Sequence, residues 1–243
     1  MGRPQYIVEH MEEDEEGSAS FPHWALLEYR QMLLLVGPGS TVHFTGLSPG
    51  SASSLRAALS SSSSSKPCAE FQVHTEGILD FAAKAQVPIS AICLLDPKAP
   101  QALSVRDASP PPNGYSHFLL GGILGDDPPR DRTSALRAHG FPGRHLGTMQ
   151  MTTDTALGVT KRVVEDHLAL GLEGTEQEGP TGATMQWVDQ PELKFGGGES
   201  VEMPFRYMVD EERTKAYRGK PEPLMPEGMR QHIRNDLDRA FEF

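Results

Sequence analysis

Cysteine is scarce in this sequence. Only two of the 243 residues are cysteines, Cys68 and Cys93, and they lie far apart and form no Cys-x-x-Cys motif. This count excludes the disulfide framework of a small secreted domain and favours a reducing compartment. The first residues show no basic flank followed by an apolar core, and no apolar run approaches the roughly 20 residues of a membrane-spanning helix. The sequence therefore predicts a folded cytoplasmic protein with no membrane segment.

Basic residues are also few. Lys and Arg number 22 against 33 Asp and Glu, which gives a formal net charge of −11. Because proteins bind bare nucleic acid largely by neutralising its phosphates with Lys and Arg, this balance argues against tight binding of free RNA or DNA. RNA binding through a locally basic face stays open. The nine histidines form no metal-ligand pattern, so no metal site is expected.

Short apolar segments alternate with helical ones along the first two thirds of the chain. Strands are expected at residues 6–8, 41–45, 71–74, 89–95 and 115–120, and helices at 24–36, 78–85, 130–139 and 154–170. Strand–helix–strand units of this length favour parallel pairing with right-handed crossovers. The sequence thus predicts an α/β fold, a mostly parallel sheet flanked by helices.

We expect residues 1–243 to form a single domain. A run of serines leaves residues 48–67 with few apolar side chains, so this segment is predicted to be a disordered insertion. Edge strands are expected at residues 187–188 and 193–195, and a last helix at 230–241. Large apolar residues recur in residues 196–243, so this tail is expected to pack back on the domain.

Residues 118–156 organise the rest of the chain. An apolar strand is followed by Gly121, Gly122 and Gly125, and a second glycine-containing loop at residues 146–147 leads to a helix start at residues 152–154. Buried strand ends, glycine loops and helix N-termini in this order are how α/β proteins build a crevice for a small molecule. We therefore expect the functional site in this stretch.

Several segments of the chain carry a resemblance to a known family. They are YIVEHME (6–12), LLEY (26–29), CLLDP (93–97), GGILGD (121–126), RHLG (144–147) followed by QMTTDTA (150–156), and EMPFRY (202–207) followed by PEGM (226–229). Together they resemble the SPOUT methyltransferases, and among these the eukaryotic protein arginine methyltransferases that modify a small-subunit ribosomal protein. The resemblance implies an α/β domain with a C-terminal trefoil knot. It also implies S-adenosylmethionine as methyl donor, with no metal.

The resemblance further implies that three strand-end loops hold the cofactor. The residues carried over are Leu95 and Asp96 in the first loop, Gly121, Gly122, Ile123 and Gly125 in the second, and Leu146, Gly147, Gln150, Met151 and Thr152 in the third, the knot loop. In the second loop, the absence of side chains on glycine would let the backbone approach the ligand closely. Many RNA-modifying relatives carry Arg where this chain has Thr152, which is compatible with a different substrate.

Acids near these loops are the candidates for catalysis. An arginine acceptor arrives protonated, so carboxylates must orient its guanidinium and accept its proton. The candidates are Asp126, Asp131, Asp154 and Glu202. Each also has a structural interpretation, since Asp126 and Asp154 lie at expected helix starts, where carboxylates commonly cap.

The resemblance favours monomethylation of an arginine in a small-subunit ribosomal protein, with the protein or the whole subunit as partner. Two alternatives from other classes stay open. The first is a SPOUT methyltransferase acting on rRNA or tRNA, and the second is a non-catalytic ribosome-assembly factor. Monomer and homodimer are both compatible with the sequence.

Overall fold

The computed structural model describes residues 3–11, 21–61, 66–109, 111–122, 131, 133–175, 177 and 179–240. Its centre is a six-stranded sheet in the order β3-β2-β1-β5-β4-β6. The strands are β1 (Gln5–His10), β2 (Thr41–Thr45), β3 (Glu70–Val73), β4 (Ile92–Leu95), β5 (His117–Gly122) and β6 (Gly143–Arg144). All five pairings are parallel. The predicted parallel α/β sheet is thus confirmed.

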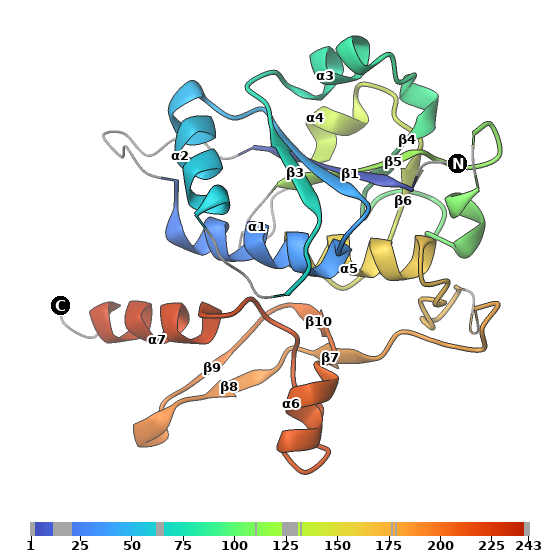
Figure 1. Cartoon of the computed structure of the whole chain (residues 1–243). Coiled ribbons are helices and arrows are strands. Elements are labelled where there is room, and N and C mark those ends of the chain that lie inside the picture. The colour runs from blue at the N-terminus through green and yellow to red at the C-terminus, as the bar shows by residue number, and fades with distance from the viewer. Residues whose placement is uncertain are drawn as a thin grey trace.

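Helices cover both faces of this sheet (Figure 1). They are α1 (His23–Val36), α2 (Pro49–Ser60), α3 (Ile78–Ala85), α4 (Thr133–Arg137) and α5 (Thr153–Val164), with short 3₁₀ turns at Ile89–Ala91, Val105–Ala108 and Gly196–Gly198. Helices α1 and α5 pack against each other below the sheet, whereas α3 and α4 lie above it.

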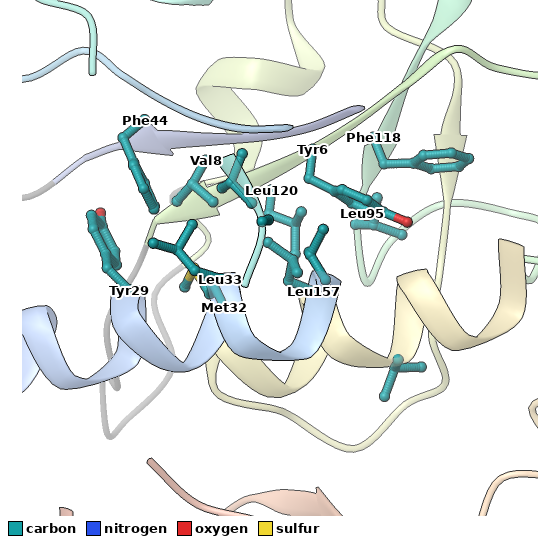
Figure 2. Packing of buried hydrophobic residues seen from close by; sticks show 14 of the residues in the cluster. Tyr6, Val8, Tyr29, Met32, Leu33, Phe44, Leu95, Phe118, Leu120 and Leu157 are labelled. Atoms are coloured by element: carbon teal, nitrogen blue, oxygen red, sulfur yellow. The ribbon is translucent and has the colours of Figure 1, made fainter. Parts of the chain in front are cut away.

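Alternation along the strands builds one core on each face. Tyr6 and Val8 of β1 join the larger cluster with α1 and α5, while Ile7 between them joins the smaller cluster with α3 and α4. Figure 2 shows side chains of α1 and α5, among them Met32 and Leu157, filling the space under the sheet. Because both faces are covered, the central residues of β1, β4 and β5 are continuously apolar and buried, as in buried parallel strands: Tyr6–Val8, Ile92–Leu95 and Phe118–Leu120.

The C-terminal third lies beyond α1 and α5, away from the sheet (Figure 1). Strands β7 (Trp187–Asp189) and β10 (Arg206–Met208) form one antiparallel pair, and β8 (Glu192–Lys194) and β9 (Ser200–Glu202) form another. Helices α6 (Glu211–Ala216) and α7 (Met229–Ala240) follow. Strand β10 packs against α5, and α7 packs against α1.

The prediction of disorder over residues 48–67 is wrong for most of that segment. Helix α2 occupies Pro49–Ser60, and the side chain of Ser48 caps it by accepting the N–H of Ser51 at 3.1 Å. Ala52, Leu55 and Leu59 are buried at helical spacing. Three apolar residues on one face are enough to dock a short helix, and the serines fill its exposed side. Residues 62–65 lie outside the described part.

Two predicted helices are shorter than expected. Helix α4 covers Thr133–Arg137 within the expected 130–139, and α5 ends at Val164 within the expected 154–170. Residues beyond α5 turn away, since His167 has a positive φ of 58°. The expected strand at 89–95 begins only at Ile92, after a 3₁₀ turn.

Candidate active site

A pocket of about 260 Å³ lies where the C-terminal third meets α1 and α5. We call it the acidic pocket. Its walls come from α1, from the start of α5, from the segment containing β10, and from α7 and the residues that lead to it. The lining residues are Trp24, Glu28, Thr152, Asp154, Met203, Phe205, Tyr207, Met225, Pro226, Met229, His232, Ile233 and Asp236. Segments more than a hundred residues apart in sequence thus build one site.

Glu28 brings a carboxyl group into this pocket from α1. It lies one helical turn after Trp24, on the stripe of α1 that packs inward, and is only 4% exposed. Its Oε2 atom has no hydrogen-bond partner within the described part of the chain. Burial, followed by the nearby Asp154, raises the pKa of Glu28 well above its ordinary value.

Asp154 supplies a second carboxyl group, from the first turn of α5. Thr152 precedes the helix as its N-cap, and its hydroxyl forms a hydrogen bond with the hydroxyl of Thr155, with 2.9 Å between the two oxygen atoms. Asp154 is 1% exposed, and its Oδ1 is unpartnered among the residues described. Burial raises the pKa of Asp154 to about 6, although hydrogen bonds from Thr152 and the backbone N–H groups of Thr155 and Asp154 oppose the shift. Capping alone therefore does not account for Asp154, because its side chain is fully buried and still has one carboxylate oxygen without a partner.

Tyr207 contributes a phenol to the same pocket. Its ring lies edge-on to Phe205, with 6.5 Å between the ring centroids. The Oη atom is buried without a partner in the described structure. Burial, then Asp154 and Glu28, raise the pKa of Tyr207, so its hydroxyl stays protonated at neutral pH.

Three polar groups with unused hydrogen-bonding capacity therefore meet in one small cavity. Leaving a buried polar group unpaired costs free energy, and an unpaired buried carboxylate costs more. The arrangement is suited to a planar cation, because two carboxylates accept from guanidinium N–H groups while aromatic rings pack against its faces.

The predicted cofactor loops begin at neighbouring strand ends along one edge of the sheet, and the third loop reaches the acidic pocket. Leu95 pairs with Arg144 of β6, and the neighbouring β5 ends at Gly122, so all three loops start at adjacent strand ends. The third loop ends at Thr152, which also lines the acidic pocket. Carboxyl ends of parallel strands are where open α/β sheets bind ligands. This arrangement fits S-adenosylmethionine. Its cationic sulfonium would be attracted toward the unpartnered carboxylate oxygen of Asp154, which lies just beyond the end of the third loop.

Two predicted site residues are occupied elsewhere. Asp96 receives hydrogen bonds from Nε and Nη2 of Arg137 at 2.5 and 2.8 Å, and Asp131 receives them from the same guanidinium and from Lys98. Burial alone would raise the pKa of Asp96, but the bonds from Arg137 outweigh it and lower the pKa. Hydrogen bonds from Arg137 and Lys98 lower the pKa of Asp131 to about 2. These ion pairs thus anchor α4 on the sheet face opposite to α5. Asp131, a predicted catalytic acid, therefore does not line the acidic pocket with Asp154.

Gly122 and Gly147 have packing reasons for lacking a side chain. Gly121 and Gly122 are the last two residues of β5, inside the strand and not in the loop after it. A Cβ at Gly122 would lie 2.9 Å from the backbone oxygen of Glu9. Gly147 has a φ of +110°, and a Cβ there would lie 2.6 Å from Leu172. Close packing of the protein on itself explains both glycines.

The remaining predicted residues divide into three groups. Leu146 is buried, and Met151 packs against the main core. Glu202 is exposed on β9 opposite Glu192 and does not line the acidic pocket, so it is not placed with Asp154. Ile123, Gly125 and Asp126 lie outside the described residues.

The sequence prediction missed Glu28 and Tyr207. Glu28 lies in the LLEY segment on the inward stripe of an amphipathic helix, where a charged residue is unusual. Tyr207 ends the EMPFRY segment, and strand alternation places it on the same side as Phe205. The acidic residue on the apolar stripe of this helix is thus the sequence signal that could have identified Glu28. Four of the segments that carry the resemblance, LLEY, QMTTDTA, EMPFRY and PEGM, line the pocket.

Comparison with known proteins agrees with these features. A family model described as protein arginine N-methyltransferase SFM1-like matches residues 5–240. The chain belongs to this SFM1-like family. Protein arginine N-methyltransferase SFM1 of Saccharomyces cerevisiae is 34% identical over 252 residues, which cover 98% of each chain. The methyltransferase resemblance noted in the sequence is confirmed.

Solved structures of the yeast enzyme share the fold of the SFM1-like chain. The crystal structure of SFM1 complexed with SAM has a TM-score of 0.71 at 31% identity, covering 97% of this chain and 92% of that one. The SFM1 complex with SAH also has a TM-score of 0.71, at 32% identity and 94% coverage of both chains.

The described residues contain neither a membrane-spanning helix nor a cluster of metal-ligating side chains. No described helix is long and apolar enough to cross a bilayer. No group of three or more His, Cys, Asp or Glu side chains that could hold a metal ion occurs in the described ranges.

Proposed function

We propose that this protein transfers a methyl group from S-adenosylmethionine to an arginine of a small-subunit ribosomal protein, in the cytoplasm. One observation carries the proposal. Glu28 and Asp154 present unpartnered carboxylate oxygens in one small pocket beside the unpartnered hydroxyl of Tyr207. These oxygen atoms can accept hydrogen bonds from a guanidinium, and the family relationship indicates the cofactor.

The acidic pocket binds and orients the acceptor. Arginine enters protonated because its pKa exceeds about 12. Oε2 of Glu28 and Oδ1 of Asp154 accept its N–H groups, while Phe205 and Trp24 form apolar walls that exclude water. The cofactor, when bound, supplies the electrophilic methyl carbon on its sulfonium. Alignment of the acceptor nitrogen in this way contributes roughly 7–11 kcal/mol to transfers of this type.

Asp154 is the best-placed proton acceptor. Forming the new N–C bond breaks the S–C bond and releases one N–H proton, because substrate and product guanidinium both carry a single positive charge. Asp154 has a pKa of about 6 in the empty pocket, and so it accepts that proton reversibly near neutral pH. Residues 95–96, 121–125 and 146–152 would hold the cofactor at the adjoining strand ends, and the trefoil knot remains part of this proposal.

The charge of the molecule supports a basic protein substrate. A net charge of −11 favours encounter with a positively charged ribosomal protein and disfavours free RNA. Among the described residues no feature favours an RNA acceptor over a protein acceptor. The RNA methyltransferase and the non-catalytic assembly factor are therefore kept as outcomes of the test.

The test is transfer of labelled methyl from S-adenosylmethionine to small ribosomal subunits, followed by separate digestion with protease and nuclease. The expected product is protease-sensitive and yields monomethylarginine from one ribosomal protein. Nuclease-sensitive label would assign the protein to RNA methylation, and absence of both label and cofactor binding would assign it to assembly. Glu28→Gln serves as the matched control, since it replaces the carboxylate by an amide of the same shape. It should lose labelling, because the amide carries no negative charge to bind the guanidinium.

A further inference from the structure

Strand β10 forms a wall between the acidic pocket and the predicted cofactor loop 146–151. Phe205 and Tyr207 line the pocket. The residue between them, Arg206, donates its backbone N–H to the oxygen of Gln150 at 2.8 Å and forms a parallel bridge with Met151. Three consecutive residues thus contact both halves of the site.

The side chain of Arg206 points away from the pocket and is held there. Its Nε and Nη2 atoms donate to the two carboxylate oxygens of Asp189 on β7, each at 2.6 Å. Its guanidinium lies over the ring of Trp187, 5.1 Å from the centroid, and that indole donates to the oxygen of Leu170 at 3.1 Å. The Arg206 side chain is only 13% exposed. Planar pairing and stacking fix its orientation as well as its position.

This anchoring reaches the loop directly. A Cβ at Gly147 would lie 3.8 Å from Nη1 of Arg206, so the guanidinium packs beside the loop whose backbone β10 also pairs with. Any shift of Arg206 therefore moves loop 146–151 and the Phe205–Tyr207 wall together. Misplacement of reacting groups by about 1 Å can reduce a rate roughly 100-fold.

We propose that Arg206 and Asp189 are positioning residues that fix β10 against loop 146–151 and so couple cofactor binding to arginine binding. The proposal rests on the function proposed above. Neither residue touches the acceptor, and both act through the backbone of β10. Since the Asp189 side chain is 40% exposed, the pair contributes little to global stability. Its effect is expected in binding and turnover.

The experiment measures binding of S-adenosylhomocysteine by calorimetry, alone and with saturating Nα-acetylarginine amide, in the full chain. In the wild type, the arginine probe should tighten binding at least fivefold, the lower end of typical coupling between sites. Asp189→Asn and Arg206→Met should weaken binding of S-adenosylhomocysteine and bring the coupling factor close to one. Arg206→Lys keeps the positive charge but cannot form the two parallel hydrogen bonds of the guanidinium to Asp189. It should give a coupling factor between those of the wild type and Arg206→Met.

A matched control is Glu222→Gln, which removes the 2.8 Å ion pair with Arg230 in the same third of the chain. It should leave affinity and coupling unchanged. Wild-type coupling in Asp189→Asn, or no coupling in the wild type, would overturn the proposal. If Arg206→Met fails to fold, Asp189→Asn and Arg206→Lys decide the question. Labelling of small ribosomal subunits separates the two proposals: protease-sensitive label without coupling would overturn only the positioning role, whereas no coupling together with nuclease-sensitive or absent label would mark failure of the proposed function.

Discussion

The carboxyl groups of Glu28 and Asp154 occupy one buried pocket, and Asp154 contributes to the raised pKa of Glu28. They come from α1 and α5, the two helices that pack together under the sheet. Like charges in a site of low dielectric cannot both ionise without a compensating cation. The empty pocket therefore retains protons that a guanidinium would displace.

Replacing either acid by its amide should separate stability from function. Glu28→Gln and Asp154→Asn keep the side-chain shape but remove a carboxylate that has an unpartnered oxygen. We expect kcat/KM to fall by about 30-fold to several thousand-fold, because loss of one member of a buried charge pair costs roughly 2–5 kcal/mol. Stability should be equal or higher by about 1 kcal/mol, since the amide is less costly to bury. Thermal unfolding and labelled methyl transfer are the measurements.

The same pair predicts opposite pH dependences for activity and stability. Asp154 has a pKa of about 6 against an ordinary value of 3.8, so the folded state binds the proton more tightly than the unfolded state. Its contribution to stability is therefore complete below pH 3.8 and is lost as the pH rises through about 6. Glu28, whose pKa is also raised, acts in the same direction.

Activity should rise over the same range, because only the ionised carboxylate binds the guanidinium and accepts its proton. A plot of kcat/KM against pH should show an inflection near pH 6, the pKa of the free enzyme. Asp154→Asn should lack this inflection and should lose less stability than the wild type over the same range, because only Glu28 then contributes to the loss. An unchanged inflection near pH 6 in the variant would show that another group titrates.

Tyr207→Phe tests the third polar group. The hydroxyl has no partner among the described residues, so its removal should change stability by less than about 0.5 kcal/mol. If it accepts from the bound guanidinium, the KM for the arginine substrate should rise about tenfold or more, because a hydrogen bond to a charged group contributes about 1.5–3 kcal/mol. Affinity for S-adenosylhomocysteine should not change. A stability loss instead would reveal a structural role.

Local patterns in the sequence predicted the sheet well. Five strands and the βαβ crossover followed from apolar periodicity, because parallel strands buried on both faces leave a strong signal. Residues 48–67 were predicted to be disordered from their composition, although Ala52, Leu55 and Leu59 dock helix α2 against the core. No sequence pattern shows that Gly122 lies against the backbone of Glu9, because the two residues belong to different strands.

The site was only half predictable. Asp154 and Thr152 were found because they stand beside a recognisable glycine loop and helix start. Glu28 was not found, because its proximity to Asp154 depends on how α1 crosses α5, a relation between distant segments. Asp131 was proposed as a catalytic acid because the sequence does not show that Arg137 folds against it and binds its carboxylate.

Asp96 and Asp131 allow that reassignment to be tested, since they share Arg137 but differ in burial. Asp96 is 3% exposed and holds Arg137 through two hydrogen bonds, whereas the Asp131 side chain is 35% exposed. Asp96→Asn should therefore destabilise the fold by about 1–3 kcal/mol, as a buried charged hydrogen-bond network is broken. Asp131→Asn should lower stability by less than about 1 kcal/mol, as an exposed pair does. If α4 only supports the site, Asp131→Asn should keep kcat/KM within about twofold of wild type, a change that corresponds to 0.4 kcal/mol. A drop comparable to that of Asp154→Asn would instead place Asp131 back in the catalytic machinery.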